Sequence, residues 1–274
     1  MAKIMVPCLR QYLLFQMNTI QLKKVEHNVK VGDICGHIEP NVTEDSLFYD
    51  GDEIVGFYIK SIDGKLKQLI EIANQELLSD RVPKSEMRRS SGLQNAELEV
   101  KQFSTIIGSC APKPHMKRPY PMISSVHQVK TAETFIKAML LSCREAENLV
   151  KEIAPTIFDK QVKIIEEKVP PQFRFGRMFT SSISNFNISA PFHRDAANLE
   201  NCVNVIIAKK SHAKGGNTTV PDYEATVDSR DNSMLVYPAW RNVHGVTPIV
   251  PLKEGGYRNS LVFYPLKAFN NYWN

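Results

Sequence analysis

The sequence HRDAAN at residues 193–198 is followed by HGVTPI at 244–249 and by RNSLVFY at 258–264. The two later segments are short and rich in β-branched or aromatic residues, and the pair Gly215-Gly216 marks a turn between them and the first segment. Many short runs separated by glycine-containing turns are typical of an antiparallel sandwich or barrel. The chain from about residue 171 onward therefore predicts a β-rich core.

The first half of the chain mixes strands and helices. GDEIVGFYIKSI (51–62) alternates and is β-branched, which predicts a strand. The segments 64–80 and 131–154 place apolar residues at helical spacing. Thr131 is expected to cap the second helix, and Pro155 to end it.

Two segments of the first half predict loops. Residues 82–92 are polar and basic, and residues 110–121 contain four prolines, which exclude a helix or a central strand. Residues 155–170 are the one candidate joint between the halves, but they lack the composition of a linker. We therefore expect a single α+β domain over residues 1–274, with the N-terminal helices supporting the β-rich core.

The composition predicts a folded protein without a membrane anchor. The chain has 274 residues, of which 43% are hydrophobic and 23% charged, enough to bury a sizeable core. Residues 1–15 are apolar but include Arg10 and lack a small-residue cleavage site, so we expect a strand or buried segment rather than a signal peptide. No apolar run approaches the ~20 residues of a membrane span. We expect an intracellular monomer, cytoplasmic or nuclear.

The cysteines and the net charge exclude some classes of protein. Five scattered cysteines with no CxxC pair argue against a disulfide framework and against a structural zinc site. The formal net charge of +5 is compatible with a polyanionic partner, but many proteins with this balance have only a solvated basic surface.

Two histidines and one aspartate form a candidate metal site. His193 and Asp195 make an HxD motif, and His244 follows in a later strand. Two imidazoles and one carboxylate form the facial triad that holds non-haem iron(II) and leaves the opposite face open. Arg258 begins an apolar strand that would point it inward, where its planar guanidinium could bind the far carboxylate of 2-oxoglutarate.

The order of these motifs resembles that of the double-stranded β-helix dioxygenases over about residues 171–268. In detail it resembles the TET/J-binding-protein (JBP) nucleobase dioxygenases, and most closely the TET 5-methylcytosine dioxygenases, since HRDAAN matches their HRDxxN and RNSLVFY matches their Arg-x-Ser-Leu-Val-Phe-Tyr. The resemblance implies a double-stranded β-helix (jelly-roll) core over residues 166–274, supported by the mixed elements and basic loops of residues 1–165. It also implies Fe(II) and 2-oxoglutarate as cofactors and dioxygen as co-substrate.

The resemblance implies an activity as well. The chain is expected to hydroxylate the methyl group of a DNA base, converting 5-methylcytosine to 5-hydroxymethylcytosine on a flipped or single-stranded nucleotide. A thymine hydroxylase of the JBP type, and a related 2-oxoglutarate oxygenase acting on a protein or small molecule, remain alternatives. A pocket too small for a base would favour the last of these. A catalytically silent reader of modified DNA is the other alternative, and the intact metal residues argue against it.

The resemblance assigns two residues to the substrate. In the family, the Asn of the first motif hydrogen-bonds the flipped base and the Tyr of the second packs against it; here these are Asn198 and Tyr264. The Asn198 amide could both donate and accept. The family has a further base-contacting His two residues after the Tyr, where this chain has Leu266, which can do neither. The departure leaves open whether the base is 5-methylcytosine or thymine.

Four basic residues lie in the two predicted loops. Arg88 and Arg89 belong to the first loop, and Lys117 and Arg118 to the second. They could bind the phosphates around an extruded nucleotide, or they could be ordinary solvated charges. DNA containing a methylated base is therefore the expected partner.

Overall fold

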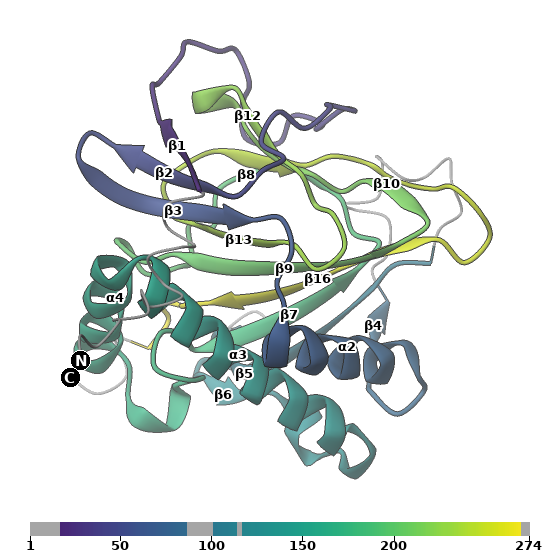
Figure 1. Cartoon of the computed structure of the whole chain (residues 1–274). Helices are drawn as coiled ribbons and strands as arrows, with labels where there is room; N and C mark the ends of the chain where they lie inside the picture. The colour runs from purple at the N-terminus through teal and green to yellow at the C-terminus, as the bar shows by residue number, and fades with distance from the viewer. Residues whose placement is uncertain (1–16, 87–100, 114–116, 270–274) are drawn as a thin grey trace, which may run out of the picture.

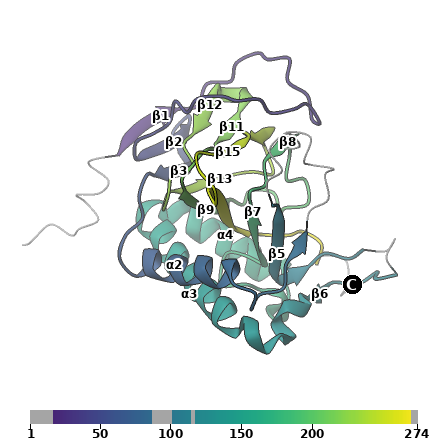
Figure 2. The ribbon, with the colours of Figure 1, turned by 90° about the vertical axis from the view of Figure 1, so that its right-hand side faces the viewer.

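Two facing β-sheets and a layer of helices make up the fold. The structure is a computed structural model that describes residues 17–86, 101–113 and 117–269. The helices lie on the outer side of the larger sheet, and the smaller sheet lies on its other side (Figures 1 and 2). This arrangement leaves an interior between the two sheets, and the site lies there.

The larger sheet combines strands from both halves of the chain. In spatial order its strands are β1 (Asn18–Gln21), β2 (Ser46–Asp50), β3 (Glu53–Ile59), β13 (Met234–Tyr237), β9 (Asn204–Ser211), β16 (Tyr257–Tyr264), β7 (Ser181–Phe186), β5 (Phe103–Cys110) and β4 (Ser85–Glu86), with β6 (Met122–Ile123) paired to β5. Antiparallel pairing of β3 with β13 and of β5 with β7 joins the two halves.

The smaller sheet contains the strands that carry the histidines. In spatial order it consists of β12 (Ala225–Val227), β11 (Thr218–Val220), β14 (His244–Val246) and β8 (Ala190–His193), while β10 (Ala213–Gly215) and β15 (Ile249–Pro251) form a separate antiparallel pair.

The helices cover the outer face of the larger sheet. They are α2 (Gly64–Leu78), α3 (Glu133–Ile153) and α4 (Pro155–Lys168), with short 3₁₀ helices η4 (Ser125–Gln128), η5 (Lys130–Ala132), η6 (Pro171–Phe173) and η7 (Pro221–Tyr223). Their apolar stripes and the sheet share one core, in which side chains such as Ile70, Phe135, Ile207 and Phe263 are fully buried. Each such side chain stabilises the fold by roughly 1.5–3 kcal/mol.

Most of the predicted elements are confirmed, with two corrections. The strand within 51–62 is β3, and the two helices are α2 and α3. The cap prediction for Thr131 is wrong, because Ala132 occupies the N-cap position and the Thr131 hydroxyl donates to Arg81 O at 2.7 Å. Pro155 does end α3, but it also begins α4, because proline is favoured in the first turn of a helix.

Several predictions lie partly or wholly outside the described residues. They include the strand or buried segment at 1–15, Cys8, and most of the loop at 82–92, in which β4 is described. In the described part of the chain no disulfide joins the cysteines. No helix there is long and apolar enough to cross a membrane. The division into residues 1–165 and 166–274 stays a prediction.

Candidate functional site

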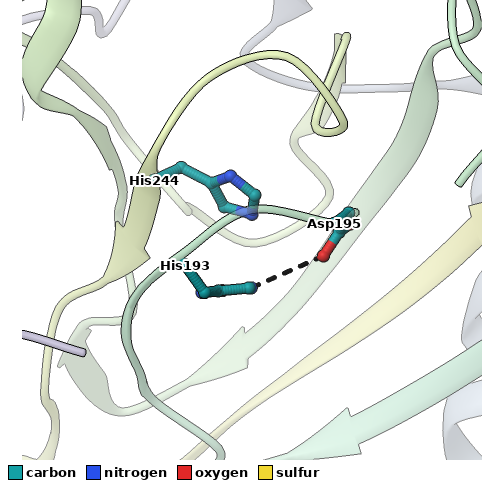
Figure 3. Close-up of side chains that lie close together, drawn as sticks. All are labelled: His193, Asp195 and His244. Atoms are coloured by element: carbon teal, nitrogen blue, oxygen red, sulfur yellow. Dashed lines mark ion pairs between the residues drawn. The ribbon is translucent and has the colours of Figure 1, made fainter. Parts of the chain in front are cut away.

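The two histidines face each other across the smaller sheet. His193 ends β8 and His244 begins β14, and antiparallel pairing places these residues directly opposite one another, with ring centroids 4.3 Å apart. Asp195 lies two residues beyond β8, with its Oδ1 atom 3.5 Å from Nε2 of His193. Figure 3 shows the three side chains converging, and one ligand atom from each lies within 4.8 Å of the others.

Backbone carbonyls determine which nitrogen of each imidazole is available. The Nδ1 atom of His193 is 2.8 Å from Pro191 O, and that of His244 is 3.1 Å from Asn242 O. A carbonyl only accepts, so each Nδ1 carries a proton, and in the neutral ring the lone pair is on Nε2. Both rings are thus held in the tautomer that binds a metal through Nε2, with the partner that ligand histidines usually have.

The aspartate is held in a matching way. Its Oδ2 atom accepts a hydrogen bond from Asn204 Nδ2 at 2.8 Å and lies 3.4 Å from Asn198 Nδ2. These contacts leave Oδ1 facing the histidines. Two imidazole nitrogens and one carboxylate oxygen, each oriented by an outer partner, fit the donor set of a non-haem iron(II) site.

Burial and mutual contacts shift the pKa values of the three groups. Burial and the neighbouring His193 lower the pKa of His244 to about 4, so this ring is neutral at pH 7. Burial acts to lower the pKa of His193, but the hydrogen bond with Asp195 and the Pro191 carbonyl outweigh it and raise that pKa. Burial acts to raise the pKa of Asp195, but its contacts with both histidines outweigh it and lower that pKa.

A cavity of about 470 Å³ opens between the sheets beside these residues. This volume is within the roughly 300–1,000 Å³ range of small-molecule pockets. Alternate residues of β16, namely Arg258, Ser260, Val262 and Tyr264, line it, as expected for a strand that turns every second side chain inward. The cavity therefore includes the proposed 2-oxoglutarate anchor as well as the metal residues.

Arg258 is a buried cation with an unused hydrogen-bonding fork. Its side chain is 3% exposed, and its Nε donates to Ser229 Oγ at 3.0 Å, while Nη1 and Nη2 have no partner among the described residues. Burial lowers its pKa to about 10, which still leaves it charged at pH 7. Gly216 makes room for it, because a Cβ there would lie 3.1 Å from Arg258 Cδ. A carboxylate would satisfy this fork.

The predicted substrate residues line the same cavity. Asn198 is 4% exposed and Tyr264 is partly buried, and Leu266 lies beside Asn198, with which it forms an isolated β-bridge. Leu266 also packs in an apolar cluster with Leu199 and Phe269. The wall next to Asn198 is thus apolar at the position where the family has a histidine.

The predicted phosphate-binding residues differ in their exposure and in their hydrogen bonds within the protein. Lys117 is exposed. Arg118 is half-buried and its guanidinium donates to the carbonyl of Ala111, which partly commits it to the structure of its own loop. Arg88 and Arg89 lie outside the described residues.

Sequence reasoning missed two asparagines of the cavity wall. Asn204 begins β9 and contacts Asp195, and Asn185 lies on β7 with no side-chain hydrogen bond within the described part of the chain. Both side chains line the cavity, Asn204 at the start of an apolar run (205–208) and Asn185 at a position that alternates with Ile183 on β7. That alternation is the signal that could have found them.

This fold and site define a 2-oxoglutarate-dependent iron(II) oxygenase. Residues 112–267 match the model of the Tet_JBP family, the oxygenase domain of the 2OGFeDO superfamily. The match spans more than half of the chain, and the chain belongs to this family. The superfamily uses Fe(II) and 2-oxoglutarate, with dioxygen as co-substrate, and the expected α+β jelly-roll fold is confirmed.

The comparison with solved structures includes one with the same overall fold. NgTET1 in complex with 5mC DNA matches with a TM-score of 0.60 at 11% identity, over 96% of this chain and 88% of that one. An oxidoreductase of the 2OG-Fe(II) oxygenase family from Burkholderia pseudomallei matches with a TM-score of 0.42 at 14% identity, over 73% of this chain and 81% of that one. No curated protein gives a significant match.

The metal site gives the first prediction. His193→Ala or Asp195→Ala should abolish succinate production from 2-oxoglutarate while the melting temperature stays near that of the wild type, because two ligands hold iron weakly. The exposed His212 offers a matched control, and His212→Ala should retain full turnover. Succinate production that persists in either site variant would disprove the assignment.

The buried arginine gives the second prediction. Arg258→Lys keeps the charge but loses the planar fork, so the KM for 2-oxoglutarate should rise about ten-fold or more, given the ~1.5–3 kcal/mol of a charged hydrogen bond. Arg230→Lys, at a more exposed arginine paired with Asp228, is the control and should leave KM unchanged. An unaltered KM in Arg258→Lys would mean that another residue anchors the co-substrate.

Proposed function

We propose that this chain hydroxylates the methyl group of a DNA base, with 5-methylcytosine as its substrate. The observation that carries the proposal is the convergence of two distant motifs on one cavity. HRDAAN (193–198) contributes metal residues and Asn198, while RNSLVFY (258–264) contributes Arg258 and Tyr264. Family membership and the likeness of the fold to NgTET1, which was solved with 5mC DNA, support it.

In this proposal each group has a defined task. His193, Asp195 and His244 hold iron(II) through Nε2, Oδ1 and Nε2, and Arg258 binds the far carboxylate of 2-oxoglutarate. When bound, these cofactors and dioxygen supply the oxidation, in which 2-oxoglutarate becomes succinate and carbon dioxide and one oxygen atom enters a methyl C–H bond. The protein's part is to hold the reactants together in the cavity between the two sheets.

Asn198 and Tyr264 are the proposed substrate-binding residues. Both line the cavity that holds the metal residues, so a base would have to leave the helical stack to reach them. Tyr264 offers a ring against which the base can pack, and Asn198 offers an amide to its polar edge. A pocket too small for a base would have favoured a protein or small-molecule substrate, and this cavity of about 470 Å³ has room for a base.

Mass spectrometry of nucleosides tests the proposal. DNA containing 5-methylcytosine is incubated with the protein, iron(II), ascorbate and 2-oxoglutarate, with Asp195→Ala as the inactive control. The wild type should yield 5-hydroxymethylcytosine in step with succinate. Succinate formation without any oxidised base in methylated or unmodified DNA would assign the oxygenase to a different class of substrate.

Leu266 gives a prediction about the choice of base. Leu266 stands where the family has a histidine that contacts the base. An enzyme rejects the wrong base mainly because that base leaves buried polar groups of the site unpaired. With one polar group fewer, this site should discriminate less strongly between 5-methylcytosine and thymine. We predict oxidation of 5-methylcytosine with weaker, measurable oxidation of thymine, and a sharper preference in Leu266→His. The measurement is competition between both bases in one oligonucleotide. If the wild type forms no thymine product and Leu266→His has the same base preference, other residues of the cavity determine the specificity.

Lys117 gives a prediction about DNA binding. If it neutralises one phosphate, Lys117→Ala should lower the slope of log affinity against log salt concentration by about one unit. Arg118→Ala should lower the slope by less, because its guanidinium already has a backbone partner. If Lys117→Ala leaves the slope unchanged, Lys117 does not bind a DNA phosphate.

A further inference from the structure

Asn204 connects the metal residue Asp195 to the substrate residue Asn198. It is 2% exposed at the start of β9, where it pairs with Tyr237 of β13. Its Nδ2 donates to Asp195 Oδ2 at 2.8 Å, and its Oδ1 accepts from Asn198 Nδ2 at 2.9 Å. One side chain therefore contacts both functional groups of the site.

The charge of Asp195 fixes the direction of this hydrogen-bond chain. An aspartate carboxylate is ionised at neutral pH and only accepts hydrogen bonds. The amide atom of Asn204 that faces it must be the NH₂ group, which turns the Asn204 carbonyl toward Asn198. Asn198 must in turn present its own NH₂ group to that carbonyl. The orientation of both amides follows from one charge.

In the same hydrogen-bond network, both N–H groups of the Asn198 amide face protein acceptors. One N–H goes to Asn204 Oδ1 at 2.9 Å, and the other is directed at Asp195 Oδ2 at 3.4 Å. Only Oδ1 of Asn198 remains for a ligand, and it is an acceptor. Of the two functions that an amide can have, donor and acceptor, this arrangement favours the acceptor for Asn198.

We propose that Asn204 is a positioning residue that orients Asp195 toward the metal and commits Asn198 to accept a hydrogen bond from the substrate. The substrate half of this inference rests on the proposed function. An acceptor at this point favours the exocyclic amine of a cytosine over the carbonyl that thymine has at the same ring position, since two facing acceptors repel. Asn204 thereby links metal binding to the choice of base.

Metal affinity tests the first half without any turnover. Cobalt(II) is titrated into the metal-free protein in the absence of DNA, and the visible absorption reports affinity and ligand geometry. Asn204→Leu should weaken binding about 10–100-fold, as loss of an outer partner of a ligand does, and should change the spectrum. Asn198→Leu should weaken it only about three-fold or less, because its contact with Asp195 is long.

Two further variants separate positioning from folding. Asn74→Leu removes a buried amide on α2 that contacts Tyr257 and Asn259, and it should leave cobalt affinity and spectrum unchanged. Asn204→Thr suits a strand, but its hydroxyl is too short to bridge Asp195 and Asn198, so it should reproduce the cobalt result if the leucine variant does not fold. Wild-type cobalt affinity in a folded Asn204 variant would overturn the metal half of the proposal.

Base competition tests the second half. With iron(II) raised until the metal site is filled, Asn204→Leu or Asn204→Thr should lower the ratio of 5-methylcytosine to thymine oxidation about ten-fold, close to the ratio in Asn198→Leu. A ratio that stays at the wild-type value would overturn the substrate half. If the wild type produces succinate but oxidises neither base, the proposed function fails, while the cobalt titration still decides the role of Asn204.

Discussion

The site depends on the antiparallel pairing of β8 with β14. This pairing sets His193 opposite His244, and the Pro191 and Asn242 carbonyls hold the two rings so that both Nε2 atoms are free. Neither strand alone could bring three ligands together, since His193 and Asp195 supply two and the neighbouring strand supplies the third. An N-terminal segment supports the edge of β8, where the N–H of Gly32 donates to Phe192 O at 2.8 Å.

The larger sheet supplies the opposite wall and the polarity of the cavity. Because alternate residues of β16 turn inward, Arg258 and Tyr264 share one wall with Asn204 of the neighbouring strand β9. None of the helices that the structure describes lines the cavity, but they bury the outer face of this sheet and so fix the strands that carry these side chains. A shift of one residue in the register of β16 would turn its inward side chains to the opposite face.

Much of the site could be predicted from the sequence, because its residues stand in short motifs at strand ends. The motif spacing predicted that His193, Asp195 and His244 converge, and strand alternation predicted that Arg258 points inward. The role of Asn204 could not be predicted, because its two side-chain partners, Asp195 and Asn198, lie in the segment after β8 and not on its own strand. The start of α4 at Pro155 was also missed, since a proline that stops one helix can begin the next.

The most direct test of the account is a crystal structure grown without oxygen, with manganese(II) and 2-oxoglutarate bound. We predict that the metal is bound by Nε2 of His193, Oδ1 of Asp195 and Nε2 of His244. The far carboxylate of 2-oxoglutarate should accept two hydrogen bonds from Arg258. A metal bound through Nδ1, or a carboxylate held away from Arg258, would contradict the account.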